Sequence, residues 1–485
     1  MVTMKPPDWV ADAVFYQIFP DRFNRAGETD HPRPSNQFEP WEDPPTVRGF
    51  KGGDLAGVVE KLDYLADLGV GAIYLNPVFA SSANHRYHTS DYFRVDPLLG
   101  GDAALKRLLG EAHARGMKVI LDGVFNHTGR GFFAFQHLLE NGSASPYRDW
   151  YYTGGFPLRA YEESPNYEAW WGNPELPKLR VETPEVRDYL LTVAEHWISF
   201  GADGWRLDVP QEIADIDFWM EFRERVKNTN PEAYLVGEIW HEAADWVVPH
   251  GPFDALMNYP LARAVLGFAG GEELDGELAS RSGLGSIDPL DGAAWLERLT
   301  TLFAHYPEEV NIAQLGLVSS HDTPRLFSML REDARRVALA LELVIFLPGV
   351  PTIYYGDEVA LPGAHDPDNR RAFPWGQVRF EDCEVWKRVR RALHLRGRYE
   401  QLRRGGFIPL YASGNRVAFN RGADVMVTAN AQSVPWELDV PCKEGTPGEL
   451  RGLVYGGRIG CSAGRLRGAG VPDRAVEVWV PYEGI

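Results

Sequence analysis

The sequence has no long apolar run. No stretch among its 485 residues approaches the roughly 20 apolar residues of a membrane-spanning helix. The opening residues, MVTMKPPDWVAD, likewise contain no uninterrupted apolar segment of signal-peptide length. We therefore expect no membrane partner and predict a cytoplasmic location.

Positive charge is also scarce. Lysine and arginine number 49 against 68 aspartate and glutamate residues, which gives a formal net charge of −19. This surplus of negative charge disfavours nucleic acid and anionic membranes as partners, because both would repel it. An uncharged ligand is indifferent to such a field.

Cysteine is the third scarce feature. The three cysteines, Cys383, Cys442 and Cys461, lack the close spacing of metal ligands. Free thiols are the favoured interpretation, and a bridge between Cys442 and Cys461 is the alternative. The cysteines therefore predict no metal site.

The remaining composition is typical of a large globular chain. Apolar residues make up 44% and charged residues 24%, enough for a sizeable core. Strand and helix patterns alternate and indicate a (β/α)8 barrel of about 250 to 400 residues, with room for a small further domain. The eight predicted strands are 14–18, 72–75, 119–121, 204–207, 236–238, 254–259, 314–319 and 350–355.

Helices are predicted where a capping residue precedes an apolar face. Asp54 precedes helical spacing that ends near Gly69, and Asp102 precedes a second run that ends at Gly116. Thr183, which is followed by proline, marks a third helix start.

The alternation breaks twice. Residues 128–180 are rich in Gly, Tyr, Trp and Pro and too long for an ordinary loop, which predicts an inserted subdomain after strand 3, over the barrel mouth. From 403 to 485, short β-like runs predict a C-terminal antiparallel β-sandwich. The barrel is then expected to comprise residues 1–127 and 181–402.

Three acidic residues end or follow predicted strands. Asp208 comes after strand four, Glu238 closes strand five and Asp322 comes after strand seven. The carboxyl ends of barrel strands converge on one mouth, where enzymes of this architecture carry their chemistry. Carboxylates that meet there would suit glycosyl chemistry, which needs one nucleophile and one acid.

Four motifs, in this order, resemble the signature regions of the α-amylase family of glycoside hydrolases: DGVFNH at 122–127, GWRLD at 204–208, EIWH at 238–241 and SHDT at 320–323. Further runs are similar to its neopullulanase, cyclomaltodextrinase and maltogenic amylase branch. They are LPKLR at 176–180, FDALMNYP at 253–260, and YYGDE at 354–358 followed by DPDNR at 366–370. The resemblance spans most of the chain and implies a retaining α-glucan hydrolase that requires no cofactor for catalysis.

The resemblance also implies roles for single residues. Asp208 would be the nucleophile, Glu238 the acid and then the base, and Asp322 a positioning carboxylate. Arg206 lies two residues before Asp208 and so points to the same side of its strand, where its charge would keep Asp208 ionised. Asp122 resembles the residue that orients this arginine.

Four residues are expected to contact the substrate, three of them from the resemblance and Trp240 from its position two residues after the acid. His127 and His321 match histidines that bind sugar hydroxyls, and the alternative is a structural role. Tyr87 resembles the aromatic beneath the reacting glucose, and Trp240 would line the leaving-group side. Core packing is the alternative for both aromatics.

Three charged residues complete the predicted site. Glu212 is associated with contacts on the acceptor side, although Pro210 and Gln211 differ from the usual residues of the branch and leave the linkage preference open. Asp366 and Arg370 would bind the sugar on the non-reducing side, or form a solvated salt bridge.

A calcium site is implied less completely. The runs DRFN at 21–24 and GGD at 52–54 resemble parts of the N-terminal calcium site of the branch. Residues 25–30 lack its usual Asn and Asp residues, and calcium needs several oxygen ligands. A structural calcium ion is thus an open expectation, and no catalytic metal is expected.

The expected substrate is an α-glucan oligosaccharide with α-1,4 linkages, such as a maltooligosaccharide, a cyclodextrin or pullulan, with some transglycosylation. An oligosaccharide α-glucosidase with α-1,6 action and a catalytically silent glycan-binding relative are the alternatives. Relatives of the branch usually carry an N-terminal β-domain that supports dimers. This chain reaches its first strand at about Val14, so we expect a monomer or weak homodimer.

Overall fold

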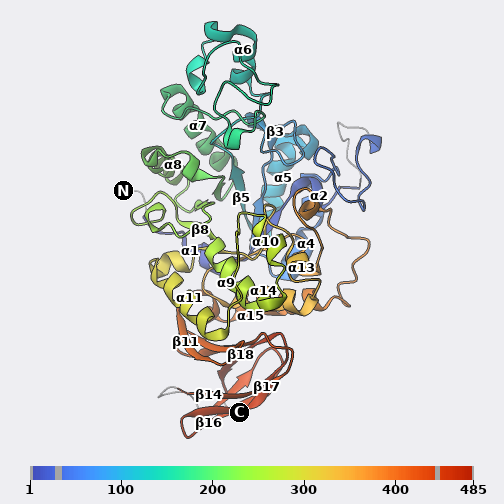
Figure 1. The fold of residues 1–485 in the computed structure, drawn as a ribbon, viewed down its shortest axis with the longest axis vertical. Coiled ribbons are helices and arrows are strands. Elements are labelled where there is room, and N and C mark those ends of the chain that lie inside the picture. Colours follow the sequence, from blue (N-terminus) through green and yellow to red (C-terminus); the bar gives the residue numbers. More distant parts are fainter. Residues whose placement is uncertain (1–3, 28–34, 443–447, 483–485) are drawn as a thin grey trace.

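The computed structural model describes residues 4–27, 35–442 and 448–482. Eight parallel strands close into a barrel, and each pairs with the next along the chain (Figure 1). The predicted (β/α)8 class is confirmed. The strands are β1 (Phe15–Ile18), β2 (Ala72–Leu75), β5 (Lys118–Gly123), β6 (Gly204–Leu207), β7 (Tyr234–Gly237), β8 (Ala255–Asn258), β9 (Leu315–Gly316) and β10 (Val350–Tyr354).

Helices surround the barrel, so that strands such as β1 and β6 are buried along their whole length. The side chain of Asp54 caps the helix after β1, as predicted, by accepting a hydrogen bond from the Gly57 amide at 2.6 Å. The surrounding helices are α3 (Leu55–Glu60), α4 (Leu62–Leu68), α5 (Gly101–Ala114), α7 (Pro184–Phe200), α8 (Ile216–Thr229), α9 (Tyr259–Gly270), α11 (Gly292–Ala304), α14 (Ala334–Phe346) and α15 (Glu384–Arg398).

Three local features differ from what the sequence predicts for a (β/α)8 barrel. Asp102 does not cap α5, because that helix already starts at Gly101 and the Asp102 carboxylate accepts a hydrogen bond from the Val95 amide at 2.8 Å. The connection from β7 to β8 contains a single 3-10 turn, Ala244–Trp246, and no α-helix. Strand β9 has only two residues within the predicted run 314–319.

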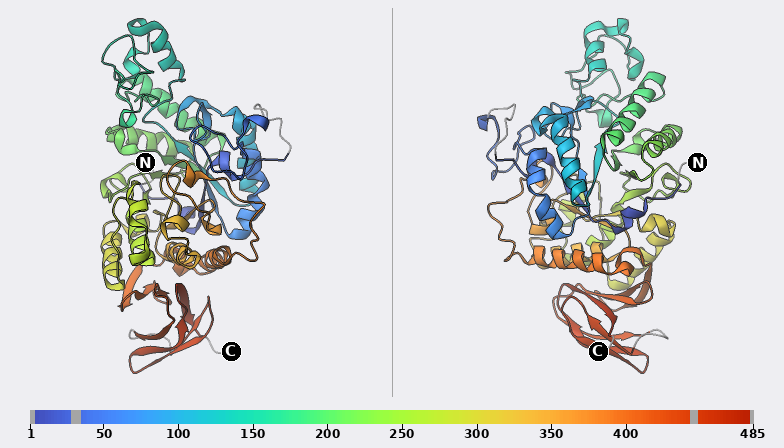
Figure 2. Two further views of the ribbon diagram at one scale, coloured as in Figure 1. Left: turned by 45° about the vertical axis from the view of Figure 1, so that its right-hand side comes forward. Right: turned by 180° about the vertical axis from the view of Figure 1, so that it is seen from behind.

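The segment between β5 and α7 extends away from the barrel (Figure 2). It contains α6 (Phe133–Asn141), and isolated bridges such as His127 to Lys178 tie its two ends together. This folding brings residues near 170 back to the carboxyl ends of the barrel strands. Shorter elements of the chain are α1 (Asp8–Asp12), α2 (Pro20–Phe23), β3 (Phe79–Ser81), β4 (Thr89–Val95), α10 (Gly276–Ser280), α12 (Glu308–Asn311), α13 (Leu326–Met329) and α16 (Glu400–Arg404).

The C-terminal region is an antiparallel β-domain at the end of the molecule opposite α6 (Figure 1). Its eight strands form one hydrogen-bonded sheet in the order β11-β12-β13-β18-β15-β16-β17-β14. The sheet curves around its own core, since Tyr411 on β11 and Trp436 on β14 stack at a ring distance of 6.1 Å. The strands are β11 (Phe407–Ala412), β12 (Arg416–Arg421), β13 (Val425–Asn430), β14 (Trp436–Pro441), β15 (Glu449–Gly452), β16 (Arg458–Ser462), β17 (Arg465–Val471) and β18 (Ala475–Pro481).

The favoured interpretation of the cysteines is wrong for two of them. Cys442 and Cys461 form a disulfide within this sheet, and Cys383 is free. The bridge follows from strand pairing, because β14 and β16 both pair with β17 and so bring the two cysteines together. In the part of the chain that the structure describes, no helix is long and apolar enough to cross a membrane.

Candidate active site

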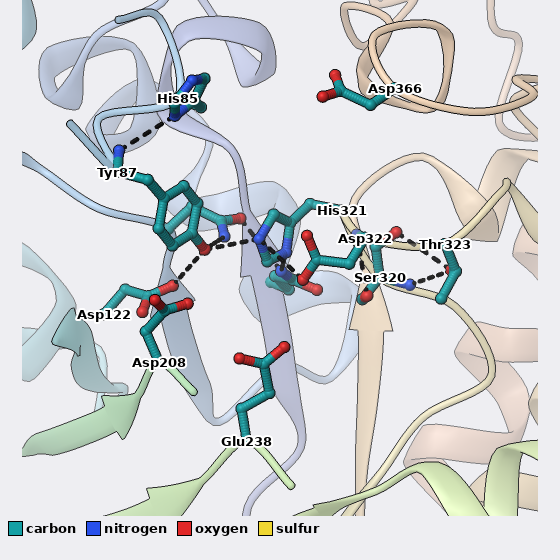
Figure 3. A network of polar contacts seen from close by, with 12 residues as sticks. His85, Tyr87, Asp122, Asp208, Glu238, Ser320, His321, Asp322, Thr323 and Asp366 are labelled. Carbon is teal, nitrogen blue, oxygen red and sulfur yellow. Dashed lines mark hydrogen bonds and ion pairs between the residues drawn. The ribbon is translucent and has the colours of Figure 1, made fainter. Parts of the chain in front are cut away.

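A cavity of about 660 Å³ opens at the carboxyl ends of the barrel strands. All the predicted site residues line it except Asp122, Arg206 and His321, which are buried behind it. The carboxyl groups of Asp208, Glu238 and Asp322 face the same space (Figure 3). The barrel therefore brings together three side chains from β6, β7 and the loop after β9.

Arg206 connects these carboxylates. Its side chain is fully buried, and Nη1 donates to Asp208 at 2.9 Å and to Asp122 at 2.7 Å. Nη2 lies 2.9 Å from Glu238 Oε2 and 4.0 Å from Asp322. Burial opposes the charge of the guanidinium, but Asp122 and Glu238 outweigh burial and raise the pKa of Arg206 well above its ordinary value. Arg206 is thus a fixed cation.

The cluster carries more negative than positive groups, so it takes up protons readily. Burial raises the pKa of Asp208 well above its ordinary value, with Arg206 opposing and Glu238 adding to the shift. Burial and the nearby Glu238 also raise the pKa of Asp322 to about 7, against the effect of Arg370. A proton shared within such a cluster is available for acid catalysis near neutral pH.

A chain of hydrogen bonds leads away from the carboxylates (Figure 3). Gln17 donates to Nδ1 of His321 at 2.8 Å, which leaves the proton of this ring on Nε2. That nitrogen lies 2.6 Å from the hydroxyl of Tyr87, which donates to Asp122 at 2.8 Å. Burial, with Arg370 and Arg206 nearby, lowers the pKa of His321 well below its ordinary value. The ring is therefore a neutral donor.

The ring of His127, unlike that of His321, leaves its Nε2 free of a protein partner among the described residues. Its ring is buried at the cavity wall, and burial lowers the pKa of His127 to about 3. Among the described residues, Nε2 has no hydrogen-bond partner. A buried nitrogen without a partner at a cavity wall suits a ligand hydroxyl.

The remaining predicted residues occupy the cavity rim. Arg370 lies 3.2 Å from Asp366 and 3.6 Å from Asp322, so the salt bridge that was the alternative interpretation forms within the cavity wall. Glu212 lies on the short turn after β6. The indole nitrogen of Trp240 donates to Glu238 Oε1 at 3.0 Å.

Sequence reasoning missed part of the wall. Trp170 and Trp171, from the segment between β5 and α7, line the cavity and stack on each other at 4.8 Å. Trp171 is 81% exposed and has a φ of 50°, which is strained for a bulky residue. The adjacent pair of tryptophans, followed by glycine, was the signal available in the sequence. The loop 281–283 was also missed, and no motif pointed to it.

The residues that resemble a calcium site do not fit one. Both oxygens of Asp21 accept hydrogen bonds, from Arg22 at 2.6 Å and from the amides of Lys51 and Gly52. The guanidinium of Arg25 donates to the Lys51 carbonyl, and Asp21 stabilises its charge. Within the described residues, no group of three or more His, Cys, Asp or Glu side chains could hold a metal ion.

The family model for the α-amylase catalytic domain matches residues 17–403. The chain belongs to the α-amylase family of glycoside hydrolases. A cyclomaltodextrinase of Geobacillus thermopakistaniensis is 41% identical over 442 residues, which cover 90% of this chain and 71% of that one.

Solved structures agree with this assignment to the α-amylase family. The crystal structure of Ttha1563 from Thermus thermophilus is 57% identical, with a TM-score of 0.95 over 98% of this chain and 100% of that chain. A debranching enzyme from Nostoc punctiforme is 41% identical, with a TM-score of 0.87 over 99% of this chain and 100% of that chain.

Proposed function

We propose that the chain is a retaining α-glucan hydrolase that cleaves α-1,4 bonds in maltooligosaccharides, cyclodextrins or pullulan, with some transfer to sugar acceptors. The observation that carries this proposal is the arrangement around Arg206. Its two terminal nitrogens contact Asp208 and Glu238, which makes these carboxylates neighbours at the wall of one cavity. Retention of configuration requires two such closely placed carboxyl groups.

Asp208 is the proposed nucleophile. Its carboxylate attacks the anomeric carbon while Glu238 gives a proton to the leaving oxygen, so that the glycosidic bond breaks and a glycosyl ester forms. Glu238 then removes a proton from water, which attacks the ester and releases Asp208. All the steps use side chains of the chain itself, and the Arg206 guanidinium, 2.9 Å from Asp208, stabilises the ionised form of Asp208 that attacks.

The other site residues are proposed to hold the sugar at the reaction centre. His127 Nε2 faces a hydroxyl group of the reacting glucose, and Asp322 accepts a hydrogen bond from the same sugar. His321 lies behind the cavity and supports this arrangement through its Nε2, which is 2.6 Å from the Tyr87 hydroxyl and 3.2 Å from Asp322. The exposed face of Trp171 stacks on a more distant glucose, because aromatic rings pack well against the apolar face of sugars. The contacts at the reacting glucose and the stacking at Trp171 together favour an oligosaccharide substrate over a single sugar.

A second candidate is an oligosaccharide α-glucosidase or debranching activity on α-1,6 bonds. It is favoured by the likeness to the Nostoc punctiforme debranching enzyme, because that likeness covers 99% of this chain and 100% of that one. The match to the Geobacillus thermopakistaniensis cyclomaltodextrinase covers a smaller part of that protein, 71% of its length. We keep α-1,4 cleavage first because the curated relatives with cyclomaltodextrinase and neopullulanase names are 39–41% identical.

Product analysis distinguishes these activities. We expect β-cyclodextrin to be opened and maltotriose to be cleaved, with the new reducing ends in the α configuration by NMR. Cleavage of panose or isomaltose without opening of β-cyclodextrin would support the second candidate. No cleavage of any of these sugars would favour a catalytically silent glycan-binding protein.

The role assignment has its own test. We expect Asp208→Ala and Glu238→Gln to lower kcat for maltotriose by about 10²- to 10⁴-fold, which is the usual contribution of one catalytic group. Circular dichroism checks that both variants stay folded. Unchanged turnover in either folded variant would contradict the assignment.

A further inference from the structure

The ring of Trp240 lines the cavity and is packed against two other residues, Tyr259 and Gly283. Its ring stacks on buried Tyr259 with 3.6 Å between centroids and an interplanar angle of 10°. Its carbonyl accepts two hydrogen bonds from Arg263, at 3.0 and 2.6 Å. The six-membered ring also faces Gly283 on the loop 281–283.

Gly283 leaves no space for a side chain. A Cβ atom built there would lie 2.8 to 3.0 Å from three carbons of the Trp240 ring, closer than carbon atoms pack. The backbone of Gly283 is not in the left-handed region, so its lack of a side chain matters for space and not for conformation. The loop can approach the indole only with glycine at this position.

The two carboxylate oxygens of Glu238 have different hydrogen-bond partners. Oε2 accepts a hydrogen bond from the Val209 amide at 3.0 Å and lies 2.9 Å from the Arg206 guanidinium. Oε1 accepts only the neutral N–H of Trp240, at 3.0 Å, among the described groups. A cation and an amide both oppose protonation of Oε2, so a proton on this carboxyl prefers Oε1.

We propose that Trp240 and Gly283 are positioning residues that aim Glu238 Oε1, the oxygen that gives up the proton, at the leaving group. The indole N–H fixes the rotation of the carboxyl group, and Gly283 fixes the indole. The proton moves from Oε1 to the glycosidic oxygen, which keeps the electron pair of the broken bond. This inference rests on the proposed function, because it needs Glu238 as the acid.

Comparison of two substrates tests the proposed positioning of Glu238 by Trp240. An alkyl leaving group, as in maltotriose, needs the proton, whereas 4-nitrophenolate leaves with little help. We expect Trp240→Phe, which keeps the stacking ring but lacks the N–H, to lower kcat for maltotriose about 10-fold and kcat for 4-nitrophenyl α-maltoside less than about 2-fold.

Gly283→Ala should shift the same selectivity through displacement of the indole. Gly276→Ala is the matched control, because a Cβ at Gly276 meets nothing within 4 Å and Gly276 has an ordinary φ. We expect this control to behave as the wild type. Equal losses on both substrates in Trp240→Phe, or an effect of Gly276→Ala equal to that of Gly283→Ala, would overturn the inference.

A second measurement does not depend on turnover. The indole N–H resonance of Trp240, identified by its absence from Trp240→Phe, should shift with pH in the wild type and should not do so in Glu238→Gln. A wild type that cleaves neither substrate contradicts the proposed function. An active wild type whose Trp240 resonance ignores Glu238 contradicts the positioning role alone.

Discussion

At the scale of single residues, one guanidinium serves several carboxylates. Arg206 contacts Asp122, Asp208 and Glu238 within 3 Å, and a second arginine, Arg370, lies 3.6 Å from Asp322 and 3.2 Å from Asp366. Two cations thus serve five carboxylates, so the arginines do not cancel the rise that burial causes in the pKa of Asp208 and Asp322. The proton uptake of the site follows from this imbalance.

The first prediction concerns pH and stability. The pKa of Asp322 is about 7 in the folded chain, above its usual value of about 3.9 in an unfolded chain. Between these values the folded state binds more protons, so the stabilisation is complete below about pH 4 and is lost as the pH rises through about 7. Calorimetry should show a decrease in Tm from pH 5 to 8 that is smaller in Asp322→Asn. Equal slopes in the two proteins would contradict it.

A second prediction concerns Trp171, whose exposure and left-handed backbone indicate that binding rather than folding requires it. Trp171→Gly should raise KM for maltoheptaose about 5- to 10-fold through loss of stacking, with kcat little changed. The same variant should be more stable by about 1 kcal/mol, because glycine adopts this φ without strain. Steady-state kinetics and urea unfolding measure the two effects. A variant that is less stable and binds as well as the wild type would refute this view.

At the scale of elements, most of the barrel was predictable because buried parallel strands are short apolar runs and their helices carry recognisable starts and stops. The motifs also located Asp208, Glu238 and Asp322, since these residues follow β6, β7 and β9 on the same side of the barrel. What escaped prediction depends on contacts distant in sequence. Trp171 reaches the cavity only because the segment after β5 folds back, and Cys442 meets Cys461 only through the order of strands β14, β17 and β16.

The α2–α3 region yields a third prediction. Arg22 and the backbone amides of Lys51 and Gly52 already satisfy Asp21, where the resemblance implied calcium. We expect neither 5 mM EDTA nor 5 mM calcium chloride to move Tm by more than about 1 °C, because a ligand that does not bind the native state cannot stabilise it. Differential scanning fluorimetry is sufficient for this test. A clear decrease in Tm with EDTA that calcium restores would show that an ion binds the chain.

At the scale of the whole molecule, a buried ion pair connects the barrel to the C-terminal sheet. Arg388 on α15 contacts Glu342 on α14 through two nitrogens, at 3.0 and 2.6 Å, and also donates to the carbonyl of Arg474 next to β18. Both side chains are almost fully buried. The sheet and the barrel should therefore lose stability together when this pair is broken.

This pair gives the fourth prediction. Glu342→Gln leaves the buried Arg388 without its anion and should lower the free energy of unfolding by about 3 kcal/mol, since breaking one side of a buried pair is costly. Glu111→Gln, which breaks an exposed pair with Arg115, is the matched control and should cost less than about 1 kcal/mol. Urea unfolding followed by fluorescence compares them. Similar losses in the two variants would show that the Arg388 pair has no special weight.

The segment that carries α6 and the β11–β18 sheet lie at opposite ends of the barrel (Figure 2). A chain anchored to a solid support through the sheet, for example by an engineered thiol at exposed Glu437, would keep its cavity turned toward the bulk solution. Large polymers in solution would then still reach the cavity. The far end of the sheet is therefore a suitable attachment point for immobilisation.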